Sequence, residues 1–117
     1  MDQTKKHQLE SAGVDVDQAL NRFMGNEALM LKFLLRFPSD ENFSRLRQAI
    51  AHGDATTAFK AAHTLKGVTG NLSLTELYAR LVPLVEDLRG GNLAAAAVRM
   101  PDLEAQYGLV TAALGQL

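Results

Sequence analysis

The chain has 117 residues, a length that fits one domain. Lys and Arg total 12 while Asp and Glu total 13, so the net charge is −1, and this balance argues against binding to the phosphate backbone of nucleic acid. The absence of cysteine excludes disulfide scaffolds, zinc sites built on cysteine, and thiol nucleophiles.

No apolar run approaches the ~20 residues that a membrane span requires, and the polar start of the chain leads into no apolar segment of a secretory signal. We therefore expect a cytoplasmic protein. Hydrophobic residues make up 47% of the chain and aromatic residues only 6%, with no tryptophan. The core must therefore be built from Leu, Val, Ala and Met, which favours helices over a β-sandwich.

Capping residues and helix stops follow one another along the chain. The first residues are polar, so we expect residues 1–11 to form a flexible N-terminal tail before one helical domain over residues 12–117. Six helices are expected in chain order. The first three are Val16 to Met24 capped by Asp15, a segment capped by Asn26 that ends at Phe37, and a third from Ser39 or Asp40 to Gly53. The last three are a fourth capped by Asp54 that runs to Leu72, a fifth that begins at the Ser73–Glu76 capping box and ends before Gly90, and Leu93 to about Leu114 capped by Asn92.

The short connections between these helices predict antiparallel neighbours. No segment alternates with a period of two, and no hairpin signal is present. The predicted fold is therefore all-α, an antiparallel up-and-down four-helix bundle with one or more additional short N-terminal helices. Pro83 and Pro101 fall inside helical patterns, so we expect a kink or a local break at each.

The fourth predicted helix carries the clearest functional signal. Its small and apolar residues share one side at about 100° per residue, and His63 points to the opposite side. The residues expected around His63 on this outer face are Thr56, Phe59, Lys60, Lys66, Gly67 and Gly70. Phe59 fits two interpretations, an apolar anchor for a partner or packing against a neighbouring helix.

Glycine on a solvated helix face needs an explanation, because it costs about 1 kcal/mol relative to alanine. Gly67 lies one turn after His63, where a missing side chain would let another molecule approach the imidazole. The alternative is that Gly67 and Gly70 mark a helix that ends early, near residue 66. The continuation of the apolar stripe through Val68 and Leu72 favours the first interpretation.

Lys66 is the helical neighbour of His63, three residues further on. An ammonium group disfavours a protonated imidazole, so this pair is poorly explained as a stabilising device. A phosphoryl group on the imidazole would carry about two negative charges, which Lys66 and Lys60 could partly offset. The alternative is an ordinary solvated helix face.

Ala62-His63-Thr64-Leu65-Lys66-Gly67, followed by Gly70-Asn71-Leu72, resembles the signature of histidine-containing phosphotransfer (HPt) domains. The stretch Val14 to Phe23, then Gly25-Asn26 and the Leu-rich segment to Phe37, resembles how those domains begin. The resemblance extends over about residues 12–115.

The resemblance implies a four-helix bundle that acts as a phosphorelay intermediate of two-component signalling. His63 would accept a phosphoryl group from a receiver-domain aspartyl phosphate and pass it to another receiver aspartate. Lys66 matches the position that steadies the phosphoryl group, and Gly67 the position that leaves room for the receiver. Thr56, Phe59, Lys60 and Gly70 are the remaining candidates for contact with the partner.

The implied partners are response-regulator receiver domains and a hybrid sensor histidine kinase. Mg²⁺ is expected on the receiver, and this chain is expected to need no cofactor or metal. The chain departs from the family at two positions, with Ser73 where glycine is frequent and Val85 where some members place a glutamine near the histidine. The hydrogen bond of that glutamine is therefore in question here.

The other candidates for chemistry are weak. His7 lies in the polar N-terminal segment, and His52 is placed to favour a helix C-terminus. No second histidine or carboxylate has metal-ligand spacing to His63, and no nucleotide-binding motif is present, so the chain is not expected to be a kinase. The alternative function is a non-catalytic helical adaptor that docks a receiver or kinase without carrying phosphate. A self-contained bundle predicts a monomer.

Overall fold

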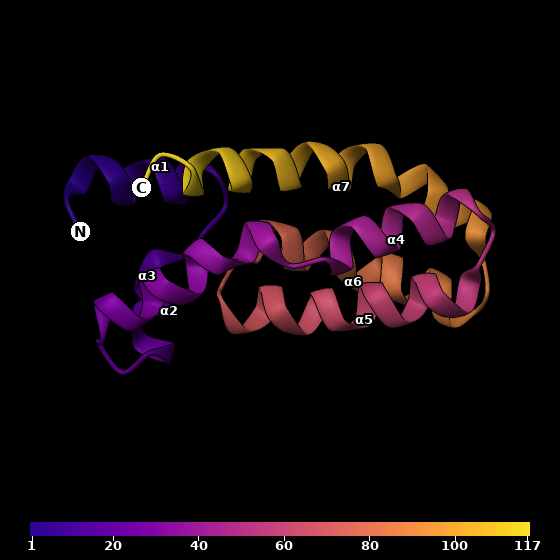
Figure 1. Cartoon of the computed structure of the whole chain (residues 1–117), viewed down its shortest axis with the longest axis horizontal. Helices are drawn as coiled ribbons and strands as arrows, with labels where there is room; N and C mark the ends of the chain where they lie inside the picture. Colours follow the sequence, from indigo (N-terminus) through magenta and orange to yellow (C-terminus); the bar gives the residue numbers. More distant parts are fainter.

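The computed structural model describes residues 1–117 as a chain of helices without strands (Figure 1). No helix is both long enough and apolar enough to cross a membrane. The elements, in chain order, are α1 (Gln3–Ser11), α2 (Val16–Arg22), α3 (Glu27–Arg36), the 3₁₀ turn η1 (Phe37–Ser39), α4 (Asn42–Ala51), α5 (Ala55–Asn71), α6 (Thr75–Arg89) and α7 (Leu93–Leu114).

Helices α4 to α7 form the predicted four-helix bundle. Each packs against the next, and α7 returns to contact α4. The connections between them are only three residues long, so successive helices run antiparallel. Leu, Ala, Val and Met supply all but two of the side chains in the core cluster, as the composition predicted; the exceptions are Phe37 and Phe43.

The N-terminal segment differs from the expected flexible tail. Residues 3–11 form α1, which lies along the C-terminal half of α7 (Figure 1). Leu9 is completely buried in the core. The link after α1 is held to the bundle by side chains, since Gln106 donates to the carbonyl of Ala12 at 2.8 Å and Thr75 donates to that of Gly13 at 3.1 Å. One buried leucine and these hydrogen bonds outweigh the polar character of the segment.

The predicted caps are confirmed at four helix starts. The side chains of Asp15, Asn26, Asp54 and Asn92 each accept a hydrogen bond at 3.0 Å from the backbone N–H three residues further on. The third predicted helix begins later than expected, at Asn42, because the Asp40 carboxylate accepts from the Asn42 N–H at 2.8 Å in the turn before α4.

The capping box predicted at Ser73 is wrong. The residue before α6 is Leu74, and no side chain caps that helix. Ser73 instead has a left-handed backbone (φ 55°), and its carbonyl accepts from the Asp15 N–H at 2.9 Å. Ser73 thus occupies the left-handed position that ends α5, where the Leu74 N–H donates to the carbonyl of Thr69 at 2.9 Å and the Ser73 N–H to that of Gly70 at 3.2 Å.

Of the kink or local break predicted at each proline, the break is absent, since α6 continues through Pro83 and α7 through Pro101. Two large apolar side chains remain exposed on α7, Val98 at 81% and Leu109 at 56%.

Candidate phosphotransfer site

Helix α5 positions the candidate nucleophile. Asp54 starts the helix by accepting from the Thr57 N–H at 3.0 Å and from its hydroxyl at 2.6 Å, and these hydrogen bonds hold the pKa of the Asp54 carboxyl below its usual value. Ala58, Ala61, Ala62, Leu65 and Thr69 are buried along the inner side of α5. The inner face thus fixes the helix and leaves the opposite face open.

His63 is exposed on that outer face. The histidine ring that does hydrogen-bond within the chain is His52, whose Nδ1 lies 2.7 Å from the carbonyl of Gln48. The His63 ring has one neighbour of note, Phe59, with centroids 5.7 Å apart and planes tilted by 38°. Both ring nitrogens of His63 are therefore free to react.

The position of Phe59 is compatible with both roles considered from the sequence, packing against a neighbouring helix and contact with a partner. It is half-buried and packs against the core, and the Arg89 guanidinium of α6 lies 5.0 Å from its ring centroid. It also borders His63 on the outer face. Phe59 thus packs against the core and Arg89 of α6 and also lies beside the His63 ring.

Lys66 lies one turn after His63 and is partly exposed. Its carbonyl accepts from the Thr69 hydroxyl at 3.0 Å, and its ammonium group forms no ion pair. Among the lysines only Lys6, bonded to Asp17, has an ion pair. The charge of Lys66 is thus available to a group placed near His63.

Gly67 is surrounded by open space. A Cβ atom added there would meet no heavy atom within 4 Å, so packing inside the chain does not require glycine. The alternative that the helix ends near residue 66 is wrong, because α5 continues to Asn71. Glycine at position 67 therefore lowers the stability of the helix and leaves the surface beside His63 without a side chain.

Gly70 has a different reason to be glycine. A Cβ atom there would lie 3.3 Å from two ring carbons of Tyr78 in α6, closer than ordinary contact. The missing side chain of Gly70 therefore makes room for Tyr78, and contact of Gly70 with a partner stays a prediction.

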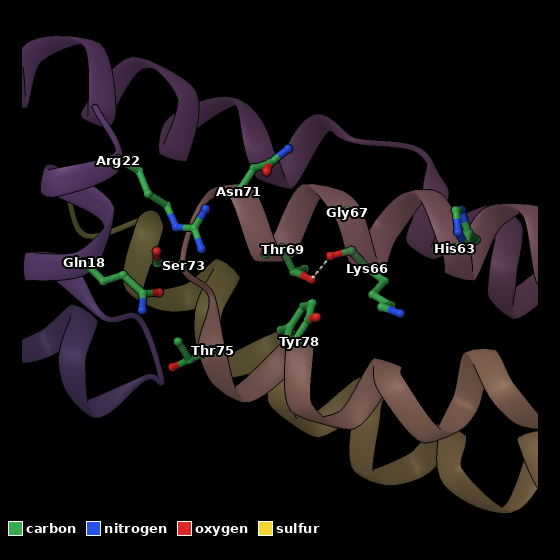
Figure 2. Close-up of a pocket in the computed structure, with 11 residues that line it drawn as sticks. Gln18, Arg22, His63, Lys66, Gly67, Thr69, Asn71, Ser73, Thr75 and Tyr78 are labelled. Atoms are coloured by element: carbon green, nitrogen blue, oxygen red, sulfur yellow. Dashed lines mark hydrogen bonds between the residues drawn. The ribbon is translucent and has the colours of Figure 1, made fainter. Parts of the chain in front are cut away.

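A polar groove extends from His63 along α5 toward α2 (Figure 2). It contains three of the six residues expected around the nucleophile, Lys66, Gly67 and Gly70, whereas Thr56, Phe59 and Lys60 lie outside it, with Thr56 and Lys60 exposed. None of the lining residues is acidic. The groove is lined by Gln18, Arg22, His63, Lys66, Gly67, Thr69, Gly70, Asn71, Ser73, Thr75 and Tyr78.

Two lining residues come from α2, and no pattern in the sequence pointed to them. Gln18 and Arg22 line the groove where the segment before α2 is tied to the turn between α5 and α6, by a hydrogen bond from the Asp15 N–H to the carbonyl of Ser73. Arg22 in the last turn of a predicted helix has an ordinary role at a helix C-terminus. A long-range contact is needed to place it near the groove.

Val85, the position aligned with the family's glutamine, is completely buried in the core. A valine also has no group that hydrogen-bonds. This position therefore offers His63 no hydrogen bond, and the site depends on the groups of the outer face.

The family model for the Hpt domain matches residues 35–116, which spans the end of α3 and the whole four-helix bundle. The chain belongs to the Hpt domain family. The match begins at Leu35, so it does not extend to the resemblance noted over residues 12–34. No curated protein and no solved structure matches the chain significantly.

Family membership gives the domain a phosphotransfer role in two-component signalling. Hpt domains are carriers of phosphoryl groups rather than kinases, and they interact with receiver domains and kinases in phosphorelays. His63, Lys66 and Gly67 all lie within the matched residues, whereas Gln18 and Arg22 of the groove do not.

Proposed function

We propose that this Hpt domain is a phosphorelay intermediate in which His63 accepts a phosphoryl group from a receiver aspartyl phosphate and passes it to another receiver aspartate. The observation that carries the proposal is the exposed His63 ring, free of hydrogen bonds, beside Lys66 and the open surface of Gly67. No other histidine of the chain lies in the groove.

The transfer step needs only one reacting group from this chain. An unprotonated nitrogen of His63 attacks phosphorus, the N–P bond forms, and the O–P bond of the aspartyl phosphate breaks with its electron pair left on the carboxylate. The ring can then release its remaining proton to water because the ring is exposed. Transfer onward is the reverse of this sequence with a second receiver.

Positioning and charge neutralisation supply most of the catalysis in phosphoryl transfer. Helix α5 holds the nucleophile, and Phe59 lies beside its ring. Lys66 offsets charge on the phosphoryl oxygens, and Gly67 lets the receiver approach. Mg²⁺ would be held by the receiver, because the groove has no carboxylate to ligate it.

The test is phosphotransfer from receiver domains carrying labelled aspartyl phosphate. We expect acid-labile, base-stable label on the wild type and none on His63→Gln. His52→Gln is the matched control, because it removes an exposed imidazole outside the groove and should leave labelling unchanged. Label on His63→Gln would assign the nucleophile elsewhere. A wild type that binds receivers without ever becoming labelled would favour the docking adaptor.

A further inference from the structure

The far end of the groove holds an arginine with no partner in the chain. Every other arginine has an ion pair or stacks on an aromatic ring, through contacts made by Arg36, Arg45, Arg47, Arg80, Arg89 and Arg99. Arg22 has neither an ion pair nor an aromatic neighbour, although it lines the groove. Its guanidinium therefore keeps its full capacity to bind a carboxylate.

Two further polar groups with free hydrogen-bonding capacity lie beside Arg22. The Ser73 hydroxyl has no hydrogen-bond partner, and the residue is only 1% exposed. The Gln18 side chain forms no hydrogen bond, since only its backbone N–H is used, by Asp15. Figure 2 shows all three side chains turned toward the same part of the groove. We call Gln18, Arg22 and Ser73 the distal subsite.

Arg22 could be explained by its place in the last turn of α2, where a cation interacts favourably with the helix dipole. That explanation accounts for the charge alone. It does not account for an unpartnered buried hydroxyl beside it or for a groove that contains no acidic residue. Unpartnered buried polar groups are rare in folded proteins, and this one faces a binding surface.

The distal subsite lies within reach of a partner docked at His63. A rise of about 1.5 Å per residue places Asn71, which borders the subsite, about 12 Å from His63 along α5. A protein interface of ordinary size covers about 800 Å² per partner, or about 30 Å across. A receiver that brings its aspartate to His63 therefore covers the far end of the groove as well.

We propose that the distal subsite binds a carboxylate of the receiver domain that exchanges phosphate with His63, and that Arg22 determines which receivers dock well. This inference rests on the proposed phosphotransfer function. A receiver that accepts phosphate on an aspartate and holds Mg²⁺ there must carry carboxylates around that site. These would complement a groove that carries Lys66 and Arg22 and no acid. Arg22 takes no part in the chemical step, because it lies at the opposite end of the groove from His63 (Figure 2).

The experiment measures transfer from a phosphorylated receiver, chosen because it labels the wild type, over a range of domain concentrations. We expect Arg22→Gln to raise KM about 5-fold to 20-fold while kcat and the lifetime of the phosphohistidine stay within twofold. Arg22→Lys should lie between the two, because it keeps the charge and loses the planar fork. The KM of Arg22→Gln should also depend less on salt.

The matched control is Arg45→Gln, which removes the same charge from α4, outside the groove, where Arg45 pairs with Glu41. An unchanged KM for Arg22→Gln, or an equal rise for Arg45→Gln, would overturn the proposal. A fall in kcat with unchanged KM would also overturn it, by placing Arg22 in the chemical step. Failure of the phosphotransfer function itself is distinguishable, because the wild type would then remain unlabelled by every receiver.

Discussion

Replacing Ser73 with glycine should stabilise the isolated domain. Ser73 has a left-handed backbone with φ 55°, which costs a residue with a side chain about 1 kcal/mol or more. Its buried hydroxyl lacks a partner, which costs about 1–3 kcal/mol. Against these gains, the substitution costs about 0.4–1 kcal/mol because glycine gives the unfolded chain more conformational freedom. Loss of the packed side chain lowers the stability further.

The balance is a gain of about 1–2 kcal/mol in the free energy of unfolding, or about 4–8 °C in Tm for a domain of this size. Urea unfolding followed by circular dichroism measures the gain directly. Two control variants separate its sources. Ser73→Ala removes the hydroxyl and keeps the backbone strain, whereas Met24→Gly relieves the same φ of 55° at an exposed residue without a hydroxyl.

We expect the gain of Ser73→Gly to exceed that of either control. A Ser73→Gly domain no more stable than the wild type would refute the reasoning. It would show that the hydroxyl is satisfied, or that its packing outweighs the strain of the turn.

The remaining predictions concern the site and the N-terminal link. Gly67→Gln should slow phosphotransfer at least 10-fold and raise helix stability by up to about 1 kcal/mol, and unchanged transfer rates would show that the glycine clears no space. Lys66→Ala should slow transfer about 10-fold without a change in Tm, and a normal rate with a normal phosphohistidine lifetime would remove it from the site. Gly13→Ala should lower stability by at least ~1 kcal/mol in urea unfolding, because Gly13 has φ 93° and its added Cβ would lie 2.6 Å from the Glu76 Cβ; unchanged stability would show that α6 shifts freely.

The features of the fold that could be predicted from the sequence depend on neighbours along the chain. Asp15, Asn26, Asp54 and Asn92 cap their helices through the N–H three residues further on, so each cap is readable locally. The turn at Ser73 was predicted incorrectly because Ser73 takes the left-handed position at the end of α5, which usually holds glycine, rather than the cap of α6. Helix α1 was missed for another reason, since its stability comes from packing against α7.

The residues of the candidate site also differ in whether the sequence could predict them. His63, Lys66 and Gly67 share one helix, so their spacing alone placed them on one face. The sequence of α5 could not show why residue 70 is glycine, because a side chain there would crowd the ring of Tyr78 on α6. The distal subsite could not be predicted at all, since nothing within α2 indicates that Arg22 faces α5.

The isolation of His63 bears on how information passes through the domain. A group added to the ring would break no hydrogen bond within the protein, because the ring makes none, and its neighbour Phe59 is held by Arg89 and the core. A ligand shifts a conformational equilibrium only through contacts that differ between the two states. Lys66, which would contact the added group, has no ion pair that loading would break. The domain would therefore keep one shape whether loaded or empty. A receiver would read the charge and chemistry of His63 itself, and the signal would need no allosteric change in the protein that carries it.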